Sequence, residues 1–308
     1  MTIRKSGLIG GMAISFAAIL WGLDGVVLTP RLYRLPIDYV VFIFHIIPFL
    51  IMSLVFTRQF RYLKKFTKSD YFFLFLIALF GGAVGTLSIV KALFLVGFQK
   101  LSVVVLLQKL QPVFGIVLAS FILNERLGPR YLLWASLAIL GGYFLTFGWQ
   151  LPHISSDNNT VLAAVFALLA AFSFGSSTVF SKKILNKYSF YTTTFYRYGF
   201  TAILMLIYVT ANGTFMQVTD TSSIEWLYFL IIAFTTGSGA IFLYYFGLRR
   251  VKAIVAIICE LFFPLSAVLF DYLFNNYQLK PIQWVSAGIM IFAIVQLNRD
   301  TARHRIRK

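Results

Sequence analysis

Charged residues are scarce in this sequence of 308 residues. Asp, Glu, Lys and Arg make up only 12% of the chain, whereas 59% of it is hydrophobic and 18% is aromatic. A soluble domain carries about 25% charged residues. The composition therefore excludes a water-soluble globule and indicates a chain whose partner is the lipid bilayer.

Residues that build redox, metal and nucleotide sites are also nearly absent. Cys259 is the one cysteine, so no intramolecular disulfide can form, and its apolar surroundings are typical of a small core residue. The histidines, His45, His153 and His304, are far apart, without a His-Glu-x-x-His motif. There is no Walker A motif. We expect no metal, no cofactor and no ATP-driven mechanism within this chain.

Basic residues are the exception to the shortage of charge, and they give a formal net charge of +17. They occur in short clusters between apolar runs rather than along one soluble face, which argues against nucleic acid as a partner. Arg4 and Lys5 precede the apolar stretch Gly7–Leu28, which is longer than the apolar core of a signal peptide. We interpret this stretch as an uncleaved first membrane helix.

Apolar stretches long enough to cross a bilayer recur along the whole chain. A helix needs about 20 mostly apolar residues to span the hydrocarbon, because unpaired backbone groups are unstable in lipid. Ten stretches qualify: Gly7–Leu28, Tyr39–Phe56, Tyr71–Gly97, Leu101–Leu123, Tyr131–Phe147, Thr160–Ser181, Phe190–Ala211, Glu225–Leu248, Ala253–Leu273 and Gln283–Asn298. The sequence predicts an all-α, polytopic protein with ten transmembrane helices.

The distribution of Lys and Arg predicts the orientation of these helices. Basic residues accumulate in the cytoplasmic segments between membrane helices. With the amino terminus inside, the outer segments hold only Arg31, Arg34, Lys100 and Lys280. We therefore expect an inner-membrane protein with both termini in the cytoplasm, and residues 299–308 as a basic cytoplasmic tail.

The two halves of the sequence correspond to each other. A shift of 152 residues aligns Gly85 with Gly237 and Pro112 with Pro264. Residues 1–150 and 151–298 are thus two copies of one five-helix unit. An odd number of helices makes the second copy enter the membrane from the other side, which gives an inverted repeat suited to alternating access. Duplication retained for folding alone is the alternative.

The sequence resembles the EamA-type branch of the drug/metabolite transporter superfamily over nearly its whole length. The likeness is carried by Trp21-Gly22, Pro112, Leu123–Leu127, Arg197 and the segment Pro264–Pro281. It implies two inverted five-helix repeats that export or exchange small metabolites such as amino acids or nucleosides. The family's usual Leu-Gly-Glu-Arg has Asn124 in place of Gly, and the second copy of the motif lacks Glu.

Ionisable residues at membrane depth are the candidate site. Such residues face a cavity or a partner, because a charge in mid-bilayer costs about 2.5 to 3.5 kcal/mol on insertion scales. At 1.5 Å of rise per residue, Asp24, His45, Lys91 and Lys109 fall on the outer half. An anion-binding pocket of Lys91 and Lys109 beside Asp24 and a structural salt bridge are both open interpretations.

Arg197 and Glu260 fall together on the inner half by the same estimate. Glu260 is a candidate to exchange a proton or bind an amine, and a fixed ion pair between the two helices is the alternative. Gln108 and Gln111 offer amide groups suited to a neutral polar substrate, or to packing between helices. Trp21, Tyr244 and Tyr245 are further candidates to line the pathway.

Pro112 and Pro264 complete the candidate site as predicted helix kinks. A proline frees a backbone carbonyl one turn earlier, here at Gln108 and Glu260. The favoured hypothesis is a secondary transporter that is not an enzyme, with proton coupling and exchange both open. A lipid flippase and an intramembrane enzyme acting on a lipid-linked substrate are the alternatives.

Overall fold

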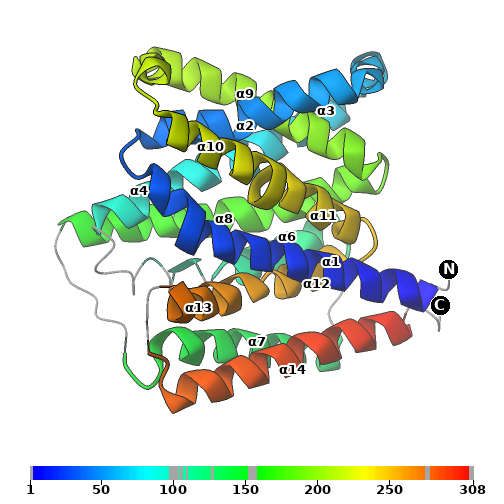
Figure 1. The fold of residues 1–308 in the computed structure, drawn as a ribbon. Helices are drawn as coiled ribbons and strands as arrows, with labels where there is room; N and C mark the ends of the chain where they lie inside the picture. Colours follow the sequence, from blue (N-terminus) through cyan, green and yellow to red (C-terminus); the bar gives the residue numbers. More distant parts are fainter. Residues whose placement is uncertain are drawn as a thin grey trace.

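The computed structural model is entirely helical across the part of the chain that it describes (Figure 1). It describes residues 3–96, 104, 107–108, 110–125, 128–151, 158–274 and 278–304. The α-helices are α1 (Ile3–Leu23), α2 (Ile37–Val55), α3 (Lys68–Leu76), α4 (Gly85–Leu95), α6 (Gln111–Ile122), α7 (Pro129–Phe147), α8 (Asn158–Leu185), α9 (Phe190–Ala211), α10 (Ser223–Ile232), α11 (Ser238–Leu248), α12 (Ala253–Cys259), α13 (Phe262–Phe274) and α14 (Pro281–His304).

Several of these helices join into longer rods through short π-helical segments. Ile77–Val84 connects α3 to α4, and Ala233–Gly237 connects α10 to α11. α1 continues through the π-helical turn Asp24–Leu28 and a 3-10 turn that ends at Leu32. Such π-helical segments are rare and occur frequently at functional sites.

Eight helical segments among the described residues are long and apolar enough to cross a membrane. The expected seventh span is the 22-residue helix α9, which carries Arg197 and several Thr and Tyr residues and is therefore more polar. Of the expected fourth span, Leu101–Leu123, the structure describes chiefly the 12-residue helix α6. The apolar helices agree with a multi-pass membrane protein, and the count of ten stays a prediction.

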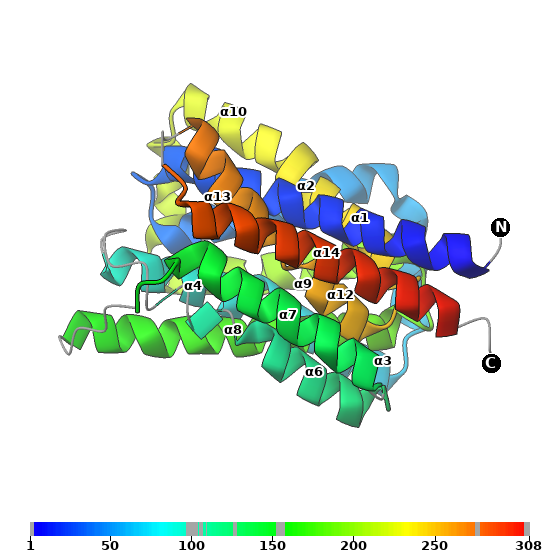
Figure 2. The ribbon, with the colours of Figure 1, turned by 90° about the horizontal axis from the view of Figure 1, so that it is seen from below.

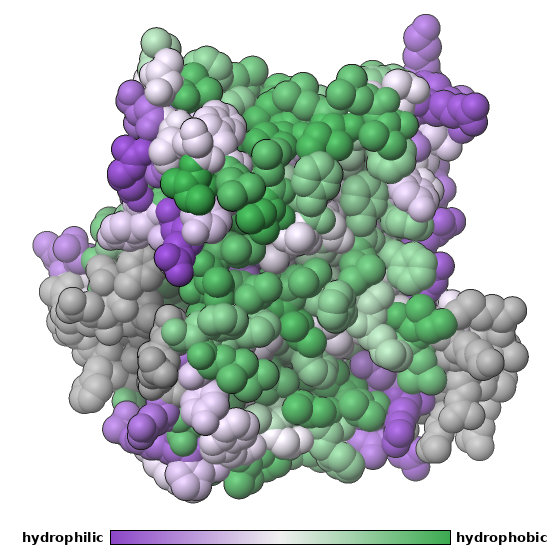
Figure 3. All heavy atoms as spheres, viewed as in Figure 1, coloured by the Kyte–Doolittle hydropathy of each residue, from purple (hydrophilic) through white to green (hydrophobic). Residues whose placement is uncertain are grey.

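The helices run roughly parallel to one axis, with both chain ends at the same side of the molecule (Figures 1 and 2). We call this side the termini end and the other side the opposite end. The space-filling view has hydrophilic residues along these two edges and a broad hydrophobic face between them (Figure 3). This is the pattern of a protein whose middle lies in lipid and whose two ends face water.

The packing mixes the two halves of the sequence. α1 packs against α11 and α13, α2 against α9, α4 against α8, and α7 against α14. Each of these contacts joins a helix from residues 1–150 to a helix from residues 151–298. The largest buried cluster lies among them and includes Ile14, Phe195 and Tyr245. Because the halves interlock, side chains from both can meet in the centre.

Candidate functional site

The carboxylate of Glu260 accepts hydrogen bonds from three side chains in the middle of the bundle. Gln111 Nε2 donates to Glu260 Oε2 at 2.7 Å. The hydroxyls of Tyr244 and Thr178 donate to Oε1 at 2.6 Å and 3.1 Å. We call Gln111, Thr178, Tyr244 and Glu260 the central cluster. Thr178 and Tyr244 are buried, and Gln111 and Glu260 are half-buried. Hydrogen bonding is how such polar atoms remain stable away from water.

Breaks between helices position Gln111 and Glu260, the two residues of the central cluster that bond to each other from opposite halves of the chain. α12 ends at Cys259 and α13 begins at Phe262, so Glu260 stands at the break between them. Gln111 is the first residue of α6, with Pro112 in its first turn. Proline is favoured there because it has no N–H to leave unpaired. Pro264 is the third residue of α13, so both prolines lie beside a helix start. That they kink their membrane spans stays a prediction.

One detail of the predicted kinks is wrong. The carbonyl of Glu260 was expected to be free, but it accepts a hydrogen bond from the Phe263 N–H at 2.9 Å. The turn between α12 and α13 supplies this donor, because the chain tightens where it leaves one helix and enters the next. It is the side chain of Glu260 that is available for chemistry.

Trp21 adds an aromatic wall to the central cluster. Its ring centroid lies 5.3 Å from that of Tyr244, with the planes inclined by 53°. Trp21 comes from α1 and Tyr244 from α11, two helices that pack against each other. The arrangement places flat apolar surface beside the hydrogen-bonding groups of Gln111 and Glu260.

Arg197 lies next to the central cluster and has its own partners. It donates to the Tyr245 hydroxyl at 3.0 Å and to the carbonyl of Gly81 at 2.7 Å, and Ser181 bonds to the same Tyr245 hydroxyl at 2.7 Å. Its Nε is buried without a hydrogen-bond partner. A side chain on residue 81 would meet Ser177 Oγ at 2.1 Å, so only glycine permits this approach.

The direct ion pair expected between Arg197 and Glu260 is not formed. Salt bridges join Arg34 to Glu225 and Lys187 to Asp70, and neither involves Arg197 or Glu260. Arg197 bonds to Tyr245, whereas Glu260 bonds to the adjacent Tyr244. Arg197 and Glu260 are therefore connected through neighbouring tyrosines of α11. Equal depth in the membrane did not reveal this, because it says nothing of the direction in which each side chain points.

The expected outer set is only partly brought together. Asp24 accepts from Thr29 at 3.1 Å and from Thr236 at 2.9 Å. Lys91 is exposed, with its ammonium 5.0 Å from the centre of the Phe166 ring. Lys109 lies outside the described residues, and Gln108 is half-buried in the chain before α6. His45 bonds to the carbonyl of Val41 at 2.8 Å and faces the Tyr198 ring.

Sequence reasoning missed the role of Glu125. Its carboxylate accepts from the backbone N–H groups of Ala253 at 3.0 Å and Ile254 at 3.1 Å, the first two residues of α12. The first N–H groups of a helix have no partner within the helix, and the helix dipole favours a negative charge there. Glu125 thus holds the end of the short helix that leads to Glu260. The sequence feature that could have indicated this role is the family-type motif Leu123–Leu127, which contains Glu125.

The same motif explains Asn124. Its φ is 53°, in the left-handed region that glycine adopts freely and asparagine tolerates better than most residues. The family's glycine and this asparagine therefore satisfy the same backbone requirement. The following residue, Glu125, bonds through its N–H to the carbonyl of Ala119 at 3.2 Å, which directs its side chain toward α12.

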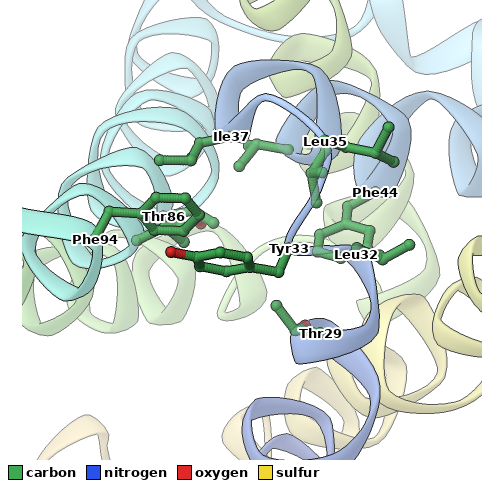
Figure 4. A pocket seen from close by; sticks show the side chains of 11 residues that line it. Thr29, Leu32, Tyr33, Leu35, Ile37, Phe44, Thr86 and Phe94 are labelled. Carbon is green, nitrogen blue, oxygen red and sulfur yellow. The ribbon is translucent and has the colours of Figure 1, made fainter. Parts of the chain in front are cut away.

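A small pocket of about 50 Å³ lies away from the central cluster, between the end of the α1 rod, α2 and α4 (Figure 4). Its lining is apolar, apart from Thr29 and Thr86. Tyr33 and Phe94 stack beside it with ring centroids 4.8 Å apart. The volume is too small for most metabolites, and the lining lacks charged groups. It is therefore a weaker candidate than the central cluster.

Comparisons with known proteins agree with the helical fold described above. The EamA-like transporter family matches residues 8–147 and 161–299. The chain is 51% identical over 291 residues to a riboflavin transporter, ImpX, of Fusobacterium nucleatum, which covers 94% of this chain and 97% of that protein. A solved crystal structure that is 16% identical superposes with a TM-score of 0.69 over 98% of this chain and 100% of that one, which shows the shared fold.

These matches and the apolar helices define the class of protein: a multi-pass membrane transporter of small metabolites rather than an enzyme. The chain belongs to the EamA-like transporter family.

Proposed function

We propose that this protein transports riboflavin across the inner membrane and binds it at the central cluster. The observation that carries the proposal is the 51% identity to a riboflavin transporter over nearly the full length of both chains. A shared substrate class is the simplest consequence.

The chemistry of the central cluster suits this substrate. Riboflavin is uncharged and has a flat tricyclic ring, an imide edge that offers one N–H between two carbonyls, and a polyhydroxylated chain. Trp21 and Tyr244 provide aromatic surface for the ring. The amide of Gln111 can both donate to and accept from the imide edge, and the carboxylate of Glu260 can accept from an N–H or a hydroxyl.

Alternating access gives the cluster a transport cycle. Gln111 belongs to the first matched repeat and Glu260 to the second, and they bond to each other. We infer that substrate replaces this bond, and that the two inverted five-helix repeats then rock to expose the cluster to one side at a time. Ten membrane helices with both termini in the cytoplasm are part of this proposal.

Glu260 is the proposed proton carrier if transport is coupled to a pH gradient. A neutral substrate brings no charge of its own, so an energised cycle requires another group that changes charge. Glu260 stands at the interface of the repeats, where a carboxylate can gain or lose a proton as access changes. Exchange of substrate for substrate requires no such step.

Counterflow into proteoliposomes tests the proposal. Vesicles loaded with unlabelled riboflavin should take up labelled riboflavin, and a nucleoside or an amino acid should not compete. Gln111→Leu should abolish this uptake. Gln283→Leu removes a buried amide that bonds to Leu145, and this control variant should retain uptake when equal amounts of folded protein are compared. Translocation of a labelled lipid headgroup without riboflavin counterflow would favour a flippase and overturn the proposal.

A further inference from the structure

Two carboxylates occupy matching positions at the starts of matching helices. Asp70 forms a capping box with Thr67 at the start of α3, and Glu225 forms one with Ser222 at the start of α10. In each box the carboxylate accepts from the backbone N–H and the hydroxyl of the cap residue, at 2.7 to 2.8 Å. Both helices then enter a π-helical segment.

Each of these carboxylates also binds a basic residue from the other repeat. Lys187 donates to Asp70 at 2.7 Å, joined by the Tyr188 hydroxyl at 2.7 Å. Arg34 donates to Glu225 at 2.8 Å. Asp70 and Arg34 lie in the first matched repeat, whereas Glu225 and Lys187 lie in the second. Both ion pairs therefore join one repeat to the other.

The two pairs lie at opposite ends of the molecule. α3 begins at the termini end, where α8 also ends just before Lys187 (Figure 1). α10 begins at the opposite end, which the α1 rod reaches just before Arg34 (Figure 1). A pathway through the centre would thus have one ion pair at each mouth.

The pairs are built to open without damage to the helices. The side chains of Arg34 and Lys187 are 61% and 51% exposed, so each can move into water, whereas the two carboxylates are 7% and 8% exposed. If the basic residue leaves, the carboxylate still has its two capping hydrogen bonds. An ion pair with one exposed partner is also weak, which makes the contact reversible.

Charge strengthens both contacts at neutral pH. The hydrogen bond that Lys187 donates to Asp70 raises the pKa of the Lys187 ammonium, and the hydrogen bond that Arg34 donates to Glu225 raises the pKa of the Arg34 guanidinium. Both basic groups therefore stay protonated throughout the neutral range. The contacts respond to movement of the repeats rather than to ordinary changes of pH.

We propose that Asp70–Lys187 and Glu225–Arg34 are a matched pair of latches, which close the termini end and the opposite end of the transport pathway in turn. This inference rests on the proposed alternating access. It adds which contacts set the relative populations of the two states in which the central cluster is open to one side. The structure has both latches closed. Because the latches are similar, neither state that is open to one side is strongly favoured, and loss of one latch shifts the population toward opening at that end.

Cysteine accessibility in the absence of substrate tests the latches. Ala78 and Ala233 are buried reporters at 0% and 2% exposure, each eight residues beyond its capping carboxylate. Single-cysteine proteins carrying Ala78→Cys or Ala233→Cys, with Cys259→Ala, are placed in nanodiscs so that maleimide reaches both surfaces. Asp70→Asn should raise the labelling rate at position 78 and lower it at position 233, each by about two- to fivefold.

The variant of the other latch, Glu225→Gln, should change both labelling rates in the opposite direction, and this reversal is the decisive result. Glu225→Gln should lower labelling at position 78 and raise it at position 233, and Lys187→Gln should reproduce Asp70→Asn. Asp220→Asn, which changes an exposed carboxylate at the opposite end that accepts from Gln217 of the same repeat, should shift neither rate. Changes of the same sign at both reporters, or no change, overturn the latches. If riboflavin counterflow fails while the labelling rates change as expected, the proposal of riboflavin as substrate is overturned and the latch proposal stands.

Discussion

Gln111 and Glu260 join the two repeats through a hydrogen bond of 2.7 Å. Gln111 begins α6, and Glu260 stands at the break between α12 and α13. Glu125, just beyond the other end of α6, binds the start of α12. α6 and α12 are thus tied at both ends, and the bond at the central end is the one that a substrate can replace.

Glu260→Gln separates binding from energy coupling. The amide oxygen can still accept from Tyr244 and Thr178, so we expect the melting temperature to stay close to that of the wild type. Riboflavin counterflow should persist, because exchange requires no proton. Accumulation driven by a pH gradient should be lost, because an amide does not take up a proton. Accumulation that survives in this variant would remove Glu260 from the coupling step.

Arg197 should be coupled more strongly to Tyr245 than to Glu260. The guanidinium donates to the Tyr245 hydroxyl and makes no direct bond to Glu260. In double-mutant cycles on the melting free energy, Arg197→Met with Tyr245→Phe should show an interaction energy of roughly 0.5 to 3 kcal/mol. Arg197→Met with Glu260→Gln should show a smaller one. The reverse order would mean that the two charges interact directly.

Glu125→Ala should destabilise the protein by about 0.5 to 2 kcal/mol, the usual cost of losing a helix cap. The two N–H groups that it binds, at Ala253 and Ile254, lie in a buried helix where water cannot easily replace the carboxylate. Thermal unfolding in detergent measures the effect. Asp220→Ala is a matched loss of a carboxylate, an exposed one that accepts from the nearby Gln217, and it should cost less. Equal losses would contradict the capping role.

Labelling in intact cells tests the orientation. Met216 is 68% exposed at the opposite end, and Lys64 is exposed at the termini end. In a Cys259→Ala background, a membrane-impermeant maleimide should label Met216→Cys and spare Lys64→Cys until the cells are opened. Labelling of Lys64→Cys alone would place the termini outside the cell and reverse the proposed topology.

The sequence by itself determined the class of the protein and the course of most helices. Apolar runs of sufficient length form helices in lipid because every backbone group has to find its partner within the segment. For this reason the predicted span Thr160–Ser181 lies within α8, and Ala253–Leu273 matches α12 and α13 together. The family-type motifs identified the transporter family correctly, since their order along the chain is a property of sequence alone.

Only the tertiary structure decided which polar side chains meet. Membrane depth suggested Glu260 with Arg197 and Asp24 with Lys91, but Glu260 bonds to Gln111 and Tyr244, and Asp24 bonds to Thr236. Depth is fixed by position along one helix, whereas contact depends on how each helix is rotated and which helix packs beside it. Asp70 and Lys187 are separated by 117 residues and meet because α3 packs against α8 and α9. Pairings of this kind arise from the packing of the whole bundle, and no local pattern in the sequence encodes them.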